Sequence, residues 1–179
     1  RPEDKENNTP ALARKLRAKL YRDKHIGGVD VTGDPSGLQR STTSEDGVNN
    51  FTVIVDTFGG GVLRPRVKLL KKQPPQVTRC EFVNELFDGY NGWEVAIDIK
   101  CRKLTEDLIY QLKNEDGSKS KQKTTDPKTG VKYERYGHLS GCLDYLLCYY
   151  LRESWYKYKS GDTAGYVIST ATIQEGFNY

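Results

Sequence analysis

The chain has 179 residues and a net charge of +4, which suits a single domain and excludes a polycation. Hydrophobic residues make up 36 % of it and charged residues 29 %, so we expect a soluble domain with a modest core. No stretch approaches the roughly 18 consecutive apolar residues of a membrane span, and no basic-then-apolar leader opens the sequence. Membrane insertion and secretion are not expected. The absence of Met and the start at Arg1 predict a piece of a longer polypeptide.

The first 25 residues are predicted to be a polar linker followed by a helix. Thr9 suits the N-cap of this helix, and Pro10 suits its first turn, where a missing N–H costs nothing. Leucines recur every fourth residue through a run of Lys and Arg, at Leu12, Leu16 and Leu20. This pattern predicts a narrow amphipathic helix.

Strand-like and helical patterns then alternate along the chain. The strand-like runs lie at 26–31, 51–58, 62–70 and 93–99. Three glycines separate the second run from the third and predict a hairpin there. Apolar residues follow helical spacing in 77–87, 104–112 and 138–151. This order predicts an α/β fold with a mixed central sheet flanked by helices.

Two further segments are distinguished by composition. Residues 114–135 are polar and rich in Lys and turn formers, which predicts a long loop or a mobile hairpin. The tail from Lys157 is rich in Tyr, Gly and Thr and has one strand-like run, 166–173.

The four cysteines form no closely spaced pair of the kind that zinc fingers and ribbons use. They are Cys80, Cys101, Cys142 and Cys148. We expect them to be reduced, mostly buried thiols in a cytosolic protein.

Two aspartates stand near the ends of predicted strands. Asp34 lies in Gly-Asp-Pro-Ser-Gly just after the first strand, and Asp98 ends the apolar strand Val95-Ala96-Ile97. If their strands are neighbours, the two carboxylates converge, and a divalent cation is the simplest remedy for their repulsion. Simpler interpretations stay open. The pentapeptide is also an ordinary turn, and Asp98 suits the N-cap of the helix that follows.

The helix predicted over 138–151 has two different faces. One face is apolar, while His138, Gly141 and Asp144 lie in a row on the opposite flank, each one turn from the next. This flank presents a histidine and an acid. A solvated polar flank without a functional role is the alternative.

Four segments, taken in order, resemble a known family. They are GDPSGLQRSTT around Asp34, the stretch from Pro74 to Asn84, AIDIKCRKLTEDL from Ala96 to Leu108, and GHLSGCLDYLL from Gly137 to Leu147. Together they are similar to the C-terminal nuclease domain of the large terminase subunit of tailed phages, which has an RNase H-like fold. The resemblance covers roughly residues 26–152.

The resemblance implies a metal-dependent endonuclease that cuts concatemeric double-stranded viral DNA in the host cytoplasm. Two Mg²⁺ or Mn²⁺ ions about 3.5–4 Å apart would activate water and stabilise the leaving 3′ oxygen. Asp34 and Asp98 match the family's metal-binding acids, with Asp30 as the alternative for the first.

The resemblance also implies a domain organisation. Residues 1–25 would join a missing N-terminal ATPase domain, 26–156 would form the nuclease domain, and 157–179 a C-terminal tail. The portal and the small terminase subunit would be further partners.

One position departs from the family pattern. The third metal-binding acid of the family falls at Gly141, three residues after His138. Either Asp144 takes over this role, or the second metal is weakly held, or the glycine is a lesion. His138 would either bind the metal itself or orient a residue that does. A catalytically silent RNase H-like module that grips DNA or docks the packaging motor is therefore the alternative function.

Contact with DNA phosphates is expected from exposed cations. The candidates are Lys100, Arg102, Lys103, Lys119, Lys121, Lys123, Lys128 and Lys132. A solubilising role is the alternative for all of them. The cations of the first helix, Arg14, Lys15, Arg17 and Lys19, would instead dock the motor domain or DNA. A third hypothesis is an unrelated α/β binding domain, in which Asp34 and Asp98 lie far apart.

Overall fold

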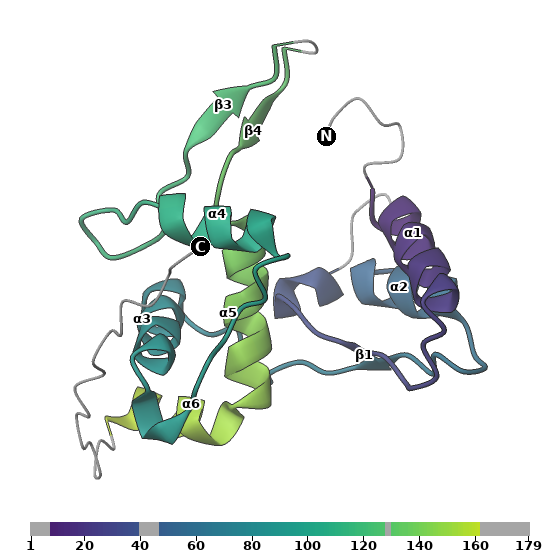
Figure 1. The fold of residues 1–179 in the computed structure, drawn as a ribbon, viewed down its shortest axis with the longest axis horizontal. Coiled ribbons are helices and arrows are strands. Elements are labelled where there is room, and N and C mark those ends of the chain that lie inside the picture. The colour runs from purple at the N-terminus through teal and green to yellow at the C-terminus, as the bar shows by residue number, and fades with distance from the viewer. Residues whose placement is uncertain (1–7, 40–46, 128–129, 162–179) are drawn as a thin grey trace, which may run out of the picture.

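The computed structural model describes residues 8–39, 47–127 and 130–161 and shows a mixed arrangement of helices and strands (Figure 1). The helices are α1 (Thr9–Arg22), α2 (Asn50–Phe58), α3 (Gln76–Phe87), α4 (Arg102–Tyr110), α5 (His138–Tyr150) and α6 (Arg152–Ser160). Two short 3-10 helices are η1 (Pro35–Leu38) and η2 (Tyr90–Gly92). The strands are β1 (Asp30–Val31), β2 (Arg66–Val67), β3 (Lys123–Thr125) and β4 (Lys132–Glu134). Within the described ranges, no helix is both long and apolar enough to cross a membrane.

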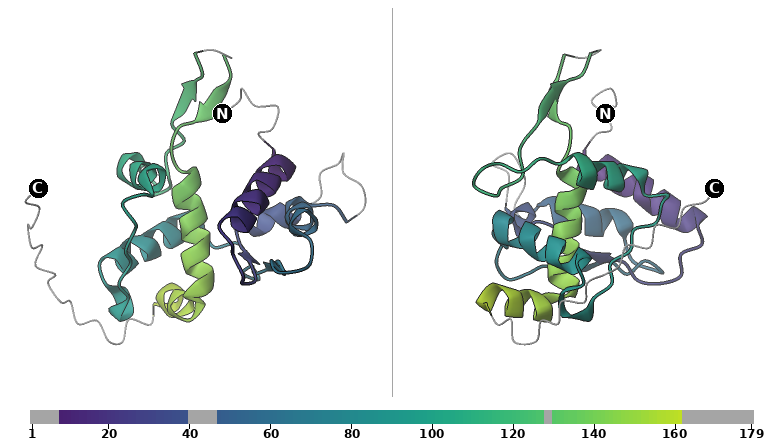
Figure 2. Two further views of the ribbon diagram at one scale, coloured as in Figure 1. Left: turned by 45° about the vertical axis from the view of Figure 1, so that its right-hand side comes forward. Right: turned by 60° about the vertical axis from the view of Figure 1, so that its left-hand side comes forward.

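Helix α5 stands between two groups of elements (Figures 1 and 2). On one side lie α1, α2 and the parallel pair β1–β2, whereas α3 and α4 lie on the other side and α6 continues from the end of α5. The antiparallel hairpin β3–β4 projects from the body in every view.

Each group has its own hydrophobic cluster. In the first group, Ala13, Phe58 and Leu63 are buried together, so α1 packs on α2 through small and apolar side chains. In the second, Phe82 of α3 meets Trp155 of α6 edge to face, with ring centroids 5.4 Å apart. Such aromatic pairs add roughly 0.5–1.5 kcal/mol to the effect of burial alone. These contacts fix α3 and α6 against α5.

The predicted hairpin over 51–58 and 62–70 is wrong, because the first of these runs is helix α2. The Asn49 side chain accepts hydrogen bonds from the backbone of Phe51 and Thr52, and the Thr52 hydroxyl accepts one from Asn49 N–H. This capping box starts a helix that buries Phe51 and Phe58, seven residues apart on one face. Local capping therefore outweighs the β-propensity of the run.

The predicted central sheet is also wrong in its extent. Of the runs 26–31 and 62–70, only Asp30–Val31 and Arg66–Val67 pair as strands, and the described residues hold two separate two-stranded sheets. The run 93–99 is extended up to Asp98 but pairs with no described strand. A strand needs a partner far along the chain, which local residue types do not specify.

The helix predictions are confirmed for α1, α3, α4 and α5, within a few residues at each end. Helix α6 was not predicted, and it covers the beginning of the segment that was expected to be a tail. The strand-like run 166–173 and residues 1–7 of the predicted linker lie outside the described residues.

Helix α5 begins with a cap that comes from another helix. Its N-cap, Gly137, has a φ of +101° and no side chain, and a Cβ there would lie 2.5 Å from Gln111 Oε1. The buried Asp107 of α4 takes over the capping role. Its two carboxylate oxygens accept hydrogen bonds from Gly137 N–H and Ser140 N–H, both at 2.7 Å. This carboxylate therefore fixes the position of the first turn of α5 relative to α4.

Replacement of Asp107 tests this cap. We expect Asp107→Ala to lower the free energy of unfolding by about 2–4 kcal/mol, because two backbone N–H groups lose their acceptor. Its neighbour Glu106 is an exposed acid paired with Lys103, so Glu106→Ala is the matched control and should cost under about 1 kcal/mol. Urea denaturation measures both. Equal effects of the two substitutions would contradict the capping role.

Candidate functional site

An open cavity of about 640 Å³ lies where the η1 segment, the start of α3, the base of the β3–β4 hairpin and α5 meet. Three of its lining residues, Asp34, His138 and Gly141, come from the segments that carry the family resemblance. The remaining wall includes Gln73, Arg79, Lys121, Glu134 and Tyr145. Acidic, basic and aromatic groups therefore share one hollow.

Asp34 is the acid that the structure holds most firmly at this cavity. Its Oδ1 accepts a hydrogen bond from Ser36 N–H at 2.8 Å, and its Oδ2 accepts one from Gln73 Nε2 at 3.1 Å. Partial burial opposes ionisation, but hydrogen bonds from Ser36 and Tyr145 and the charge of Arg79 lower the pKa of Asp34 below its usual value. Asp34 is therefore a fixed, ionised carboxylate at neutral pH.

The wall beside Asp34 is built around the phenol of Tyr145. Gln73 Nε2 lies 3.1 Å from the Tyr145 hydroxyl, and Arg79 Nη1 donates to the same oxygen at 3.0 Å. Arg79 Nη1 also donates to Pro74 O at 3.1 Å. Sequence reasoning missed these wall residues. Arg79 and Tyr145 had a signal, since they lie in the resembling stretches 74–84 and 137–147, whereas Gln73 had none.

His138 and Gly141 lie on the first two turns of α5, at the cavity. His138 is exposed, and its Nε2 is 3.9 Å from Glu134 Oε2. Gly141 is helical, and a Cβ built on it meets no atom within 4 Å beyond its own helix backbone. The position of the family's third acid is therefore open space, and a longer side chain fits there.

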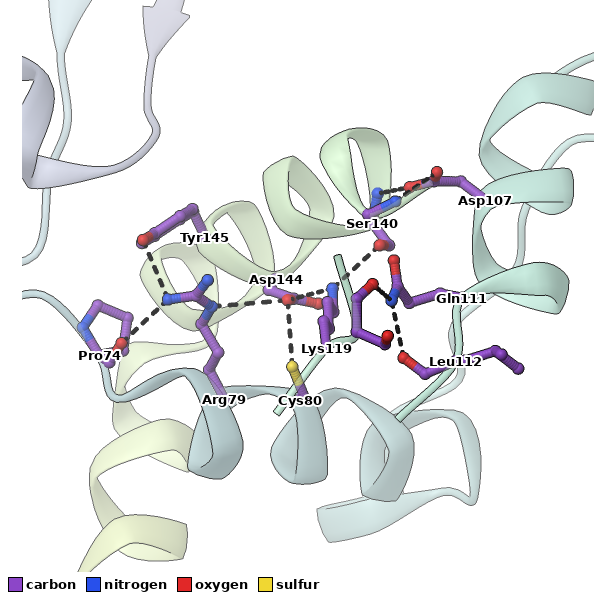
Figure 3. A network of polar contacts seen from close by, with 12 residues as sticks. Pro74, Arg79, Cys80, Asp107, Gln111, Leu112, Lys119, Ser140, Asp144 and Tyr145 are labelled. Atoms are coloured by element: carbon purple, nitrogen blue, oxygen red, sulfur yellow. Dashed lines mark hydrogen bonds and ion pairs between the residues drawn. The ribbon is translucent and has the colours of Figure 1, made fainter. Parts of the chain in front are cut away.

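Asp144 lies one turn further along α5, but its carboxylate is buried in the protein interior (Figure 3). Lys119 Nζ lies 2.6 Å from its Oδ2, and Arg79 Nε lies 3.6 Å from the same atom. Cys80 Sγ donates to this oxygen at 3.6 Å. Burial and the neighbouring Asp144 raise the pKa of Cys80 to about 11. Asp144 is not among the residues that line the cavity, and it balances two buried cations instead.

Asp98 and Asp30 lie outside the lining of the Asp34 cavity as well. Asp98 is exposed, and its Oδ1 accepts a hydrogen bond from Lys100 N–H at 2.8 Å in the turn before α4. Asp30 pairs through Oδ1 with Arg66 Nε at 2.7 Å, and its Oδ2 accepts from the Tyr150 hydroxyl at 3.1 Å. In the described part of the chain, no group of three His, Cys, Asp or Glu side chains is placed to hold a metal ion.

The cations that were predicted to contact DNA fall into three groups. Lys119 is mostly buried on Asp144 and Ser140, which gives it an internal role. Lys128 lies outside the described residues. The others are exposed, namely Lys100, Arg102, Lys103, Lys121, Lys123 and Lys132.

All four cysteines are free, but Cys101 and Cys142 are exposed, so the prediction of mostly buried thiols holds only for the other two. Cys148 is fully buried, and burial raises its pKa to about 12. Neither Cys80 nor Cys148 is therefore an activated nucleophile.

Comparison with known proteins finds no matching family model, no similar curated protein and no similar solved structure.

The interior role of Asp144 predicts a specific order of stability effects. We expect Asp144→Ala to cost about 3–5 kcal/mol, since it leaves two buried cations without a counter-charge. Lys119→Met should cost less, because Arg79 still faces the carboxylate. Lys121→Ala, which breaks an exposed pair with Glu134, should cost under about 1 kcal/mol. Urea denaturation of the three variants checks this order, and a neutral Asp144→Ala would refute the assignment.

Proposed function

We propose that the chain is a metal-dependent DNA endonuclease domain with an RNase H-like fold, of the kind found in the large terminase subunit of tailed phages. It would act in the host cytoplasm on concatemeric double-stranded DNA, beside an ATPase domain, the portal and the small terminase subunit. One observation carries the proposal. Asp34 lies about 100 residues before His138 and Gly141 in the sequence, the resemblance assigns the three positions to one site, and they line one cavity.

The chemistry of Asp34 supports a cation at this cavity. Mg²⁺ and Mn²⁺ prefer carboxylate oxygen and water ligands, and Asp34 is held ionised with its carboxylate at the cavity wall. A bound divalent cation would lower the pKa of a water molecule and neutralise charge on the phosphodiester. Lys121 and Arg79 also line the cavity, and they pair with Glu134 and Asp144, respectively.

Asp98 needs a rearrangement to join this site, and the structure offers a route for one. Its segment is extended and unpaired, and Ile99 is 85 % exposed. An apolar groove of about 680 Å³ runs between α1 and α5, lined by β1 and by Leu104, which closely follows the segment in sequence. Within the described residues, β1 pairs with one strand alone. We propose that the segment adds to the other edge of β1 and so carries Asp98 toward Asp34.

The catalytically silent, DNA-gripping module is the second candidate. Its support is that Gly141 brings no carboxylate to the cavity and that the described residues form no three-ligand metal cluster. The two candidates differ in whether divalent metal converts DNA into cut products.

Cleavage of supercoiled plasmid with Mg²⁺, Mn²⁺ or EDTA tests the proposal. We expect metal-dependent nicking and linearisation by the chain as it stands, and loss to the EDTA level in Asp34→Asn and Asp98→Ala. Glu94→Ala is the matched control, because Glu94 is an exposed acid on the same extended segment, and it should cut normally. Cutting that survives both aspartate substitutions would refute the assigned site.

Substitution of Gly141 tests the third-ligand position. Both Gly141→Ala and Gly141→Asp fit the open space, and we expect the Ala variant to gain about 0.5–1 kcal/mol of stability from removal of a helical glycine. Cleavage should rise in Gly141→Asp alone, because only that variant adds a carboxylate to the cavity. If neither the original chain nor either variant cuts plasmid DNA, with or without divalent metal, the DNA-gripping module is favoured.

A further inference from the structure

Positive charge is concentrated in one part of the molecule. Residues 8–39 and 47–72 contain eleven Lys and Arg against four Asp and Glu, a net charge of +7. Residues 73–127 and 130–161 contain thirteen of each, a net charge of zero. The group formed by α1, α2, β1 and β2 is therefore strongly cationic, although the whole chain carries only +4.

Helix α1 supplies much of this charge. It has five cations and no acid, and all five cations are exposed, namely Arg14, Lys15, Arg17, Lys19 and Arg22. Ala13 packs into the cluster with α2, and Leu12 and Leu16 face the apolar groove. The cations are therefore distributed over the surface of α1 that the core and the groove leave to solvent.

Further cations follow α1 in the chain, although Asp23 at the end of the helix pairs with Lys19 and Arg22. After Arg22 and Lys24, the chain turns back so that Gly28 lies beside the β2 segment. A Cβ on Gly28 would lie 3.6 Å from Arg64 O and 3.9 Å from Arg66 Nη2. Gly28, Arg64 and Arg66, with Pro65, line a hollow of about 380 Å³ at this junction. Gly28, in the loop that follows α1, and two arginines of the β2 segment thus share one surface.

The β2 segment leads from this junction to the Asp34 cavity. Arg66 lies in β2 and the half-buried Lys68 directly follows that strand, so their side chains lie on one face, whereas Arg64 has a φ of +35° and lies in the turn before it. Lys71 and Lys72 are exposed and directly precede Gln73, whose amide binds Asp34. A row of cations therefore runs along the chain from the α1 junction to the cavity wall.

We propose that this cationic track, formed by the exposed cations of α1 and of residues 64–72, binds the phosphate backbone of a DNA duplex and guides it to the Asp34 cavity. The inference rests on the proposed function for its choice of DNA. Its own support is the +7 net charge of residues 8–39 and 47–72 and the exposure of most of their cations, which suits a polymer with regularly repeated negative charges. Contacts of this kind position the duplex without reading its sequence. The track, rather than the β3–β4 hairpin, is then the main DNA surface.

DNA binding tests the track. We would measure the affinity for a fluorescein-labelled duplex of about 30 base pairs by fluorescence anisotropy, in EDTA and over a range of salt concentrations. The variant carries Arg22→Gln, Lys24→Gln and Arg64→Gln, three exposed cations at the junction. The control variant loses the same charge elsewhere, through Lys113→Gln, Lys157→Gln and Lys159→Gln. A third variant removes Lys121, Lys123 and Lys132 at the hairpin. Thermal denaturation verifies that all of them fold.

We expect the junction variant to flatten the slope of log K against log salt by about 2–3, since each lost phosphate contact removes about 0.9. The control should leave the slope near that of the original chain. An unchanged slope in the junction variant, or a loss confined to the hairpin variant, would overturn the track. EDTA prevents cleavage, so this result is separate from the nuclease test. Duplex binding that depends on the track but never leads to cutting would keep this inference and remove the proposed nuclease.

Discussion

The ion-pair cluster around Asp144 is the constraint on which the candidate site depends. A carboxylate that is 2 % exposed needs nearby cations, because an unpaired buried charge costs several kcal/mol. Lys119, from the loop after α4, and Arg79, from α3, supply them. The Asp144 side chain therefore holds both α3 and the loop after α4 against α5 (Figure 3).

This cluster and the Asp34 cavity share Arg79. Its Nε faces Asp144, while its Nη1 donates to the Tyr145 hydroxyl, which in turn contacts Gln73. Gln73 donates to Asp34, so the position of the cavity acid is linked to the buried pair through three side chains. The two acids have different surroundings as a result. Asp144 is neutralised inside the protein, whereas Asp34 faces the cavity, where a cation from solvent can reach it.

Local sequence patterns predicted the parts of the fold that local interactions determine. The apolar spacing over 138–151 and 77–87 predicted α5 and α3 because their buried faces repeat at helical intervals. The same reasoning failed for 51–58, where β-branched residues suggested a strand but the Asn49 capping box begins a helix. The run 93–99 was also predicted as a strand but pairs with no described strand, because pairing depends on a partner elsewhere in the chain that local residue types do not specify.

The candidate site was predictable only in part, for the same reason. The resembling motifs grouped Asp34 and Asp98 with His138 and with Gly141 or Asp144. Asp34, His138 and Gly141 do share a cavity, whereas Asp98 and Asp144 do not line it. Lys119 lies in a polar, lysine-rich segment whose pattern indicates solvent exposure, yet its ammonium group is tied to Asp144. Asp107 looked like one more surface acid on α4, because the orphan N–H groups it binds belong to a helix 30 residues further on. Such long-range partners leave no periodic signal.

A divalent cation is proposed to bind at the Asp34 cavity. Titration of Mn²⁺ followed by the EPR signal of the free ion measures this most directly, with Gly141→Asp compared to Gly141→Ala. We expect tighter Mn²⁺ binding in the Gly141→Asp variant, which adding Asp34→Asn should abolish and adding Asp30→Asn should leave in place. Equal Mn²⁺ binding by the Asp and Ala variants, or binding that Asp34→Asn leaves unchanged, would contradict a cation site at this cavity.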